Sequence, residues 1–507
     1  MNFAMIFRIL GWMLMFEAAF MAPSGVVAAI YREGDVIWLI CSMGICLAAG
    51  AVMVLVSRPK NRRIYAREGS VICALVWFLY SIFGALPFYL SGYIRDFVDA
   101  VFETASGFTT TGASILSDVE ALPHWLLFWR SFTHWVGGMG ILVFVMAIIP
   151  LAAGGSTMYL MKAESPGPSV KKMVPKAGQT AGILYKMYIG LTTIEAVLLL
   201  VLGMPLFDSL CLTFGTAGTG GFAVLNSGLA GYPIPQQIVI TVFMILFGTN
   251  FSVYYLIITG HIKDVPKVSE VMTYFSIIGV AIALITATIS HLYPSWLLAL
   301  KDAAFQVASI ITTTGYSTTD FELWPHFSKW VLVLLMFCGA CAGSTGGGIK
   351  VSRIQVAVKT VIKELDNAIH PNNVRKIKYD GKPLEHSVLR GINVFIMAYF
   401  LMMAVSILLI SIDDFDLETN FTAVAATLNN IGPGLEKVGP TMNYSGYSTF
   451  STCVLIFDMI AGRLEILPVL ILFSVHTWKD GDLFARPGRG RKRTSKADEA
   501  LLDEGFQ

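Results

Sequence analysis

The chain has 507 residues, of which 55% are hydrophobic and 14% are charged, and its formal net charge is +2. So few charged residues cannot cover the surface of a soluble globule of this size, and the composition therefore indicates an integral membrane protein. The small net charge gives no support for a nucleic-acid-binding protein, and no nucleic-acid partner is expected.

Apolar runs long enough to cross a bilayer recur along the whole chain. Because a membrane-spanning helix needs roughly 20 mostly apolar residues, these runs predict an all-α membrane protein with about ten transmembrane helices. They lie near residues 3–30, 36–56, 70–91, 125–150, 183–204, 236–260, 271–293, 329–349, 388–412 and 449–475. The first run is too long for a signal-peptide core and is followed closely by the second. A retained helical hairpin over 1–56 is therefore preferred to a cleaved signal peptide.

The connections between these runs differ in charge. Alternate loops and the C-terminal segment hold 26 of the 36 Lys and Arg residues, whereas the opposite loops hold four. By the positive-inside rule, the basic loops and both termini are expected in the cytoplasm. The basic tail over 477–507 is expected to be disordered near the inner leaflet.

The seven cysteines lie mostly inside apolar runs, so they are expected to be small packing residues and not a disulfide framework. Cys338 and Cys341 have a spacing seen in metal sites. No second pair accompanies them, and packing is the preferred interpretation here too.

Four connections repeat one pattern. Each begins with an acidic residue and reaches a cluster rich in Thr, Asn and Gly just before the next span. The separation from the fourth residue of the opening to the final glycine is 10, 10, 10 and 11 residues. The openings start at Asp99, Asp208, Asp302 and Glu418, and the clusters are Thr109 to Gly112, Gly218 to Gly221, Thr312 to Gly315 and Asn429 to Gly432. The pattern predicts four repeats of helix, half-helix, loop and helix, over 70–150, 183–260, 271–365 and 388–476. The acids are interpreted as helix-start residues, with vestibule charges as the alternative.

Such loops suit a cation pore. Irregular backbone at membrane depth must be buried in protein or line a water-filled cavity, and four loops around one axis meet that condition together. Their carbonyl groups would replace the hydration shell of a monovalent cation, and glycine permits the sharp turns required. The half-helices would direct their partially negative C-terminal ends toward the axis. A single cluster is typical of an extracellular turn, but four matched copies favour a pore.

These motifs resemble those of the Trk/Ktr/HKT superfamily of K⁺ transporters, and over about residues 1–476 the chain looks like its bacterial Trk-type membrane subunits. The stretches that carry the resemblance are the four clusters, Trp129 to Trp135, and Ala342 to Lys350. The N-terminal hairpin is similar to the extra helix pair of Trk-type subunits. The second repeat departs in having Gly218 and Gly220 where the first and third repeats have Thr, which leaves its register open.

The resemblance implies a K⁺ uptake subunit of the bacterial inner membrane, with a channel-like gated pore selective for K⁺ and Rb⁺ over Na⁺. It implies no enzymatic activity, no cofactor beyond the transported K⁺, a homodimer, and a cytosolic TrkA-like regulatory subunit with nucleotide-binding domains. Related transporters with Ser at the first filter glycine favour Na⁺, so Gly112 indicates K⁺. The expected K⁺-binding residues are Thr110, Thr111, Gly112, Thr219, Gly220, Gly221, Thr313, Thr314, Gly315, Asn430, Ile431 and Gly432.

The predicted eighth span contains a second candidate site, because its apolar run breaks at Gly339 to Gly348. This stretch is too flexible and polar for a helix that faces lipid. The neighbours of Lys350 do not fit the Walker pattern, so nucleotide binding is not expected. The resemblance implies an intramembrane gate below the filter, with close helix packing as the alternative. The expected gate and permeation-path residues are Gly343, Ser344, Thr345, Gly346, Gly347, Gly348, Lys350 and Arg463.

Charged side chains within predicted spans need a cavity or a partner. Arg463 lies midway along the last predicted span. The resemblance implies that it narrows the path below the filter, and an ion pair with Asp458 or with an acid of another span is the alternative. Arg130 and His134 share one helix face and are interpreted as structural.

Two other functions compete with a channel-like pore. A K⁺ symporter coupled to H⁺ or Na⁺ is the alternative, although transporters with broken helices usually contain two inverted repeats and not four copies of the same sense. A membrane-embedded enzyme is disfavoured, because no span carries a HExxH-type metal motif or a nucleophile with its base.

Overall fold

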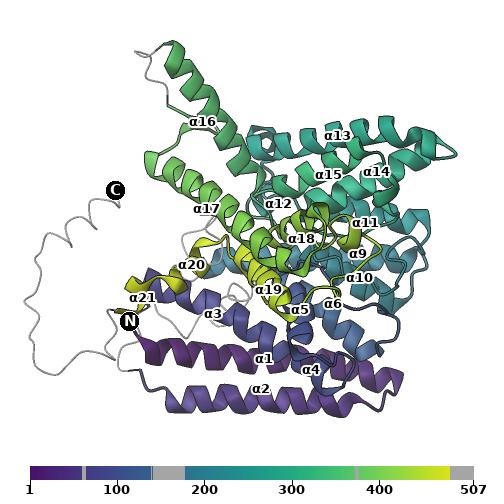
Figure 1. The fold of residues 1–507 in the computed structure, drawn as a ribbon, viewed down its shortest axis with the longest axis vertical. Coiled ribbons are helices and arrows are strands. Elements are labelled where there is room, and N and C mark those ends of the chain that lie inside the picture. The colour runs from purple at the N-terminus through teal and green to yellow at the C-terminus, as the bar shows by residue number, and fades with distance from the viewer. Residues whose placement is uncertain (60–63, 139, 141–176, 371–375, 480–507) are drawn as a thin grey trace, which may run out of the picture.

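The computed structural model describes residues 1–59, 64–138, 140, 177–370 and 376–479, and this part is almost entirely helical (Figure 1). Six of its helical segments are long and apolar enough to cross a membrane, and a bent helix pair would make a seventh. The all-α, multi-pass class is thereby confirmed, while the total of about ten spans stays a prediction. The expectations for the loop over 151–176 and for the tail from 480 lie outside the described residues.

The elements follow the predicted order of a hairpin and four repeats. The hairpin is α1 (Phe3–Tyr31) and α2 (Val36–Val56). The first repeat contains α3 (Ala66–Gly84), α4 (Leu86–Leu90), α5 (Phe97–Phe108) and α6 (His124–Gly138). The second contains α9 (Ala177–Val201), α10 (Leu206–Gly218), α11 (Ile234–Phe247), α12 (Phe251–Ile258) and the 3₁₀ helix η1 (Ile262–Lys267).

The third repeat contains α13 (Ser269–Ile289), η2 (Ser290–Leu292), α14 (Trp296–Ile311), η3 (Phe321–Leu323), α15 (His326–Cys338) and α16 (Val351–Ile369). A small antiparallel ribbon follows, β1 (Lys378–Tyr379) and β2 (Lys382–Pro383), in which Tyr379 is opposite Lys382. The fourth repeat contains α17 (His386–Ile410), η4 (Ser411–Asp413), α18 (Leu417–Asn429), η5 (Glu436–Val438), α19 (Thr449–Arg463), α20 (Leu467–Phe473) and α21 (Val475–Lys479).

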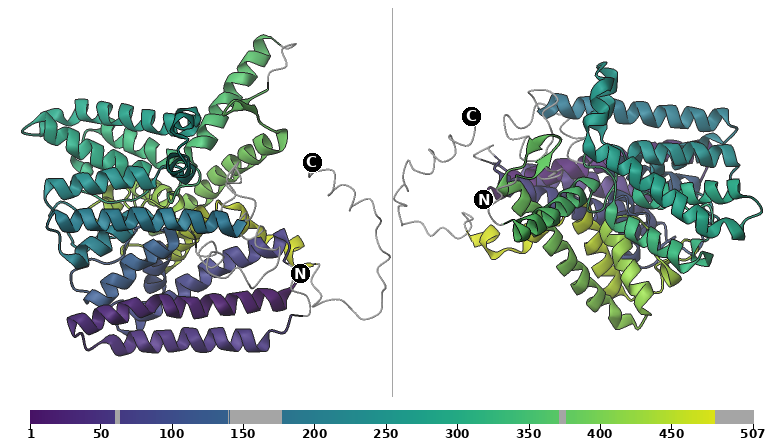
Figure 2. Two further views of the ribbon diagram at one scale, coloured as in Figure 1. Left: turned by 180° about the vertical axis from the view of Figure 1, so that it is seen from behind. Right: turned by 90° about the horizontal axis from the view of Figure 1, so that it is seen from above.

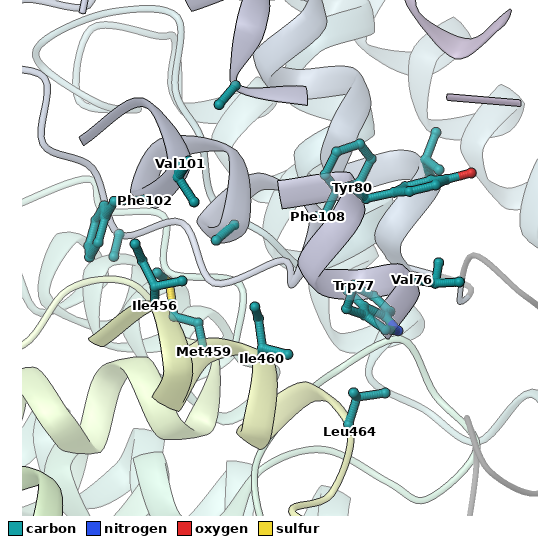
Figure 3. Packing of buried hydrophobic residues seen from close by; sticks show 14 of the residues in the cluster. Val76, Trp77, Tyr80, Val101, Phe102, Phe108, Ile456, Met459, Ile460 and Leu464 are labelled. Carbon is teal, nitrogen blue, oxygen red and sulfur yellow. The ribbon is translucent and has the colours of Figure 1, made fainter. Parts of the chain in front are cut away.

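The repeats form a closed ring. The half-helices α5, α10, α14 and α18 each pack against the first helix of their own repeat. The second helix of each repeat also packs against the half-helix of the following repeat: α6 on α10, α11 on α14, and α15 on α18. The last of these contacts, α19 on α5, joins the fourth repeat to the first, and Figure 3 shows Ile456 and Met459 beside Val101 and Phe102.

The hairpin lies at one edge of this ring, with α1 packed on α3 and α6 (Figures 1 and 2). Its two helices approach closely where Gly11 meets Gly50. A Cβ atom on Gly11 would lie 2.7 Å from the Gly50 carbonyl oxygen, and one on Gly50 would lie 2.6 Å from that of Gly11. Small residues allow this backbone approach, which is a common basis of helix association in membranes.

The second helices of the second, third and fourth repeats are not the continuous spans that the apolar runs predict, while part of the predicted span over 125–150 lies outside the described residues. The span over 236–260 is two helices bent by 93°, and the span over 329–349 is helical only to Cys338. The span over 449–475 breaks after Arg463, where Glu465 and Ile466 have positive φ angles of 55° and 65°. Hydropathy registers apolar composition and not backbone direction, so it could not locate these breaks.

Three of the opening acids, Asp99, Asp208 and Glu418, lie in the first turn of their half-helices, although none of them is the capping residue. The side chains that cap α5, α14 and α18 belong to Asp96, Ser295 and Asp416. Asp302 lies well inside α14, where it accepts a hydrogen bond from Thr318 at 2.8 Å and pairs with Lys301. The helix-start interpretation was therefore wrong for Asp302, because α14 begins earlier than its sequence pattern indicates.

Candidate ion pore and gate

All four half-helices end in the same backbone geometry. The first filter residue of each repeat is left-handed, with φ of 56° at Thr110, 56° at Thr219, 59° at Thr313 and 56° at Asn430. The N–H of the next residue bonds to a carbonyl five residues earlier, at 2.8 to 3.0 Å in every repeat. These pairs are Thr111 to Ser106, Gly220 to Gly215, Thr314 to Ser309 and Ile431 to Ala426. The shared geometry resolves the register of the second repeat, in which Thr219 corresponds to Thr110.

The three threonines occupy a strained conformation. A β-branched residue with φ near +56° is a genuine outlier, whereas Asn tolerates this region. Such strain persists only where the surroundings impose it, and it concentrates at functional sites. Its repetition at Thr110, Thr219 and Thr313 therefore marks these loop starts as more than ordinary turns.

The glycines predicted to belong to the filter, Gly112, Gly221, Gly315 and Gly432, form a closed ring of contacts. Each has a positive φ, between 80° and 96°. A Cβ atom on the first three would lie 1.9 to 2.1 Å from a carbonyl oxygen of the next repeat, and on the fourth it would lie 2.8 Å from one of the first repeat. The four contacts are Gly112 with Gly220, Gly221 with Thr314, Gly315 with Ile431, and Gly432 with Thr111. Only glycine allows these backbones to lie so close, and the ring closes in chain order.

Side chains behind the filter differ between repeats. In the first repeat the hydroxyl groups of Thr109 and Thr111 lie 2.8 Å apart, and in the third those of Thr312 and Thr314 lie 2.7 Å apart. Glycines replace both threonines in the second repeat. In the fourth, Asn430 donates to Thr111 at 3.0 Å and to the Met459 carbonyl at 2.8 Å, which ties the last loop to the first.

Arg130 has the structural surroundings that the sequence suggests. It forms a buried ion pair with Glu103 at 2.6 Å, and its guanidinium lies 3.5 Å from the centre of the Phe222 ring. Glu103 also accepts hydrogen bonds from Ser114 and from the Ile115 N–H, at 3.0 and 3.1 Å. Sequence reasoning missed Glu103, since an acid inside a short half-helix shows no pattern that distinguishes it from a surface residue.

The glycine-rich segment after α15 lies directly against the filter. The Gly347 N–H donates to the Thr313 hydroxyl at 2.6 Å. A Cβ atom on Gly347 would lie 2.5 Å from the Asn429 carbonyl oxygen, and one on Gly346 would lie 2.8 Å from that of Thr312. The predicted gate segment and the predicted filter are thus in contact.

Other residues hold this segment from its far side. Glu270, at the start of α13, accepts from the Ala342 N–H at 2.6 Å and from the Ser352 N–H at 3.2 Å. The Lys350 ammonium group donates to the Gly346 carbonyl. Glu270 was not predicted, because an acid at the edge of an apolar span looks like an ordinary helix-start residue.

Arg463 lies at the C-terminal end of α19 and not midway along a continuous span. It donates to the Thr345 carbonyl at 2.8 Å and to the Gly137 and Gly138 carbonyls at 2.5 and 2.8 Å. The suggested partner Asp458 instead accepts from Ser406, at 2.7 Å. One side chain therefore connects the first, third and fourth repeats.

Comparison with known proteins agrees with this architecture. The model of the TrkH family, described as "Cation transport protein", matches residues 40–292 and 298–480. The chain is 36% identical to the Trk system potassium uptake protein TrkH of Salmonella typhimurium over 95% of its own length and all of the relative, and 30% identical to TrkG of Escherichia coli over 92% and 97%. The crystal structure of the potassium transporter TrkH from Vibrio parahaemolyticus superposes with a TM-score of 0.85 at 32% identity, over 94% of this chain and all of that one.

The match covers most of the hairpin's second helix, nearly all of the four repeats and the segment between α15 and α16. Both the sequence and the three-dimensional arrangement are shared over nearly the full length. The chain is therefore a multi-pass membrane protein that belongs to the TrkH family of cation transport proteins.

Proposed function

We propose that this chain is the K⁺ uptake subunit of a Trk system and conducts K⁺ and Rb⁺, in preference to Na⁺, through the axis of its four repeats. The single observation that carries the proposal is the closed ring of filter glycines, each against a carbonyl of its neighbour. The loops of such a ring supply backbone oxygens around one axis without adding charge, as a dehydrated monovalent cation requires. The twelve residues Thr110 to Gly112, Thr219 to Gly221, Thr313 to Gly315 and Asn430 to Gly432 would bind the ion.

The experiment is ion flux in liposomes that contain the purified protein. Liposomes loaded with K⁺ should take up external ⁸⁶Rb⁺ without a proton or Na⁺ gradient. Liposomes loaded with Na⁺ in place of K⁺ should not take up ⁸⁶Rb⁺. Uptake that depends strictly on a proton or Na⁺ gradient would favour the symporter instead.

The gate of this pore would be the segment Gly343 to Gly348, held by Lys350 and Arg463. Its support is the direct hydrogen bond from the Gly347 N–H to the Thr313 hydroxyl and the hydrogen bond from Arg463 to the Thr345 carbonyl. Hydrogen bonds to a charged donor are stronger than neutral ones, so Arg463 would stabilise the closed arrangement. Opening would require the segment to leave Thr313.

Regulation would come from a TrkA-like cytosolic subunit with nucleotide-binding domains, acting on a homodimer in the bacterial inner membrane with both termini cytoplasmic. Helix α16 continues directly from the gate segment and projects from the helix bundle (Figures 1 and 2). Its exposed apolar side chains would meet the partner or second copy; they are Val358, Val361, Ile362, Leu365 and Ile369. Copurification with the regulatory subunit, and its loss on changing these residues to Ser, would test this.

A further inference from the structure

The second repeat lacks the threonine pair that lies behind the filter in the first and third repeats. The position equivalent to Thr111 and Thr314 is Gly220. Its φ is not positive, unlike that of Gly221, so the backbone does not require glycine there. The reason for glycine at this position is therefore a close contact with a neighbouring group and not the backbone angle.

That neighbour is His134 of the first repeat. A Cβ atom on Gly220 would lie 2.3 Å from Cγ and Nδ1 of the fully buried imidazole ring and 2.5 Å from its Cδ2. All three contacts are with the His134 side chain and none with backbone. The ring thus fills the space that a threonine occupies in the first and third loops.

The hydrogen bonds of His134 join two repeats. Nδ1 lies 2.7 Å from the Gly107 carbonyl oxygen at the end of α5, and the Phe222 N–H lies 3.2 Å from Nε2. A carbonyl only accepts and an N–H only donates, so these partners assign the neutral tautomer with its proton on Nδ1. The Phe222 N–H belongs to the peptide that directly follows the filter glycine Gly221.

We propose that His134 is a positioning residue of the selectivity filter: it replaces, from the first repeat, the side chain that the second loop lacks and orients the peptide after Gly221. This inference rests on the proposed K⁺ filter. It assigns a role to His134 in ion selection, where the sequence alone suggests a purely structural residue.

The decisive variants are His134→Asn, Gly220→Thr and the double variant His134→Ala with Gly220→Thr. The Asn side chain keeps a donor for the Gly107 carbonyl but is too short to accept from Phe222. We expect a folded protein with a K⁺/Na⁺ permeability ratio lowered about fivefold, the factor that corresponds to one neutral hydrogen bond. A ratio equal to that of the parent protein would overturn the proposal.

Gly220→Thr alone should lower the thermal unfolding temperature and the permeability ratio, because its side chain overlaps the imidazole ring. In the double variant the ring is gone and the loop regains the threonine of the first and third repeats, so both quantities should recover toward the parent values. If Gly220→Thr lowers the unfolding temperature and the permeability ratio as much in the double variant as it does alone, the proposal is overturned. A failure of both variants to fold would count as that result. A parent protein that passes Na⁺ as well as K⁺ would instead contradict the proposed function, while the stability comparison would still report on the contact.

Discussion

The four predicted filter loops are similar in all repeats, whereas the helices that follow them differ from one repeat to the next. The four loops are alike in backbone conformation and backbone hydrogen bonding, and the final glycine of each lies against a carbonyl group of a neighbouring loop. The following helices differ: α11 is bent against α12, α15 gives way to the gate segment, and α19 ends at Arg463. In the proposed pore, the four similar loops would surround the ion, and the helices that differ between repeats would provide the gate.

The strongest test of the regular ring is to replace its glycines by Ala one at a time. Gly112→Ala, with a Cβ atom 1.9 Å from the Gly220 oxygen, should abolish selective ⁸⁶Rb⁺ uptake. Gly432→Ala, at 2.8 Å from the Thr111 oxygen, should retain the most activity. Gly112→Ser should also erode discrimination against Na⁺, and an unchanged K⁺/Na⁺ ratio in that variant would contradict the assigned register.

Variants of Arg463 test the role of the helices that differ between repeats, because this residue lies at the end of α19. Arg463→Ala removes hydrogen bonds to three carbonyl groups, and we expect flux to rise by at least about tenfold, since one charge-assisted bond corresponds to about 1.5–3 kcal/mol. Arg463→Lys keeps the charge but not the planar fork that reaches several carbonyls, so it should give an intermediate flux. Unfolding without a change in flux would assign the side chain a structural role only.

A matched pair of variants can distinguish the effect of the contact between the proposed filter and gate from the effect of changing the filter itself. Thr313→Val and Thr110→Val remove equivalent hydroxyl groups with little change in shape, but only Thr313 accepts the Gly347 N–H. Both should alter ion selectivity, and only Thr313→Val should increase flux in the absence of a regulatory subunit. The expected increase is about fivefold, for one neutral hydrogen bond. Equal flux from the two variants would show that the contact does not hold the gate closed.

The smallest effect on transport is expected outside the ring. Gly11→Val should force the hairpin helices apart and lower stability by about 1–3 kcal/mol, the usual cost of overpacking. Gly44→Ala in α2 is the control, because a Cβ atom there meets nothing within 4 Å. Thermal unfolding should separate these two variants, while both keep the parent K⁺/Na⁺ ratio. A changed ratio in Gly11→Val would show that the hairpin shapes the pore.

Much of the fold was predictable because bilayer and repeat impose strong patterns on a sequence. Long apolar runs indicated the hairpin and the first helix of each repeat, and the recurring clusters located all four loop starts. The helix breaks were not predictable in detail. Ile466 is apolar, and only its positive φ shows that the chain turns there.

Some residues of the candidate site were also predictable from the sequence and others were not. Glycines such as Gly112 were visible from their spacing, but Glu103 and Glu270 were not, since their partners are distant in sequence. The absence of Thr at Gly220 left the register of the second repeat open, and the structure explains it by the imidazole of His134.

The sequence by itself determined that the chain crosses the membrane many times and carries four copies of one loop, because apolar length and repetition are local properties. Tertiary structure alone decided which loop contacts which, that Gly347 meets Thr313, and that Arg463 joins three repeats through backbone carbonyls. Such contacts join residues separated by tens to hundreds of positions. Their partners are often backbone atoms, which every residue has and no sequence pattern reveals.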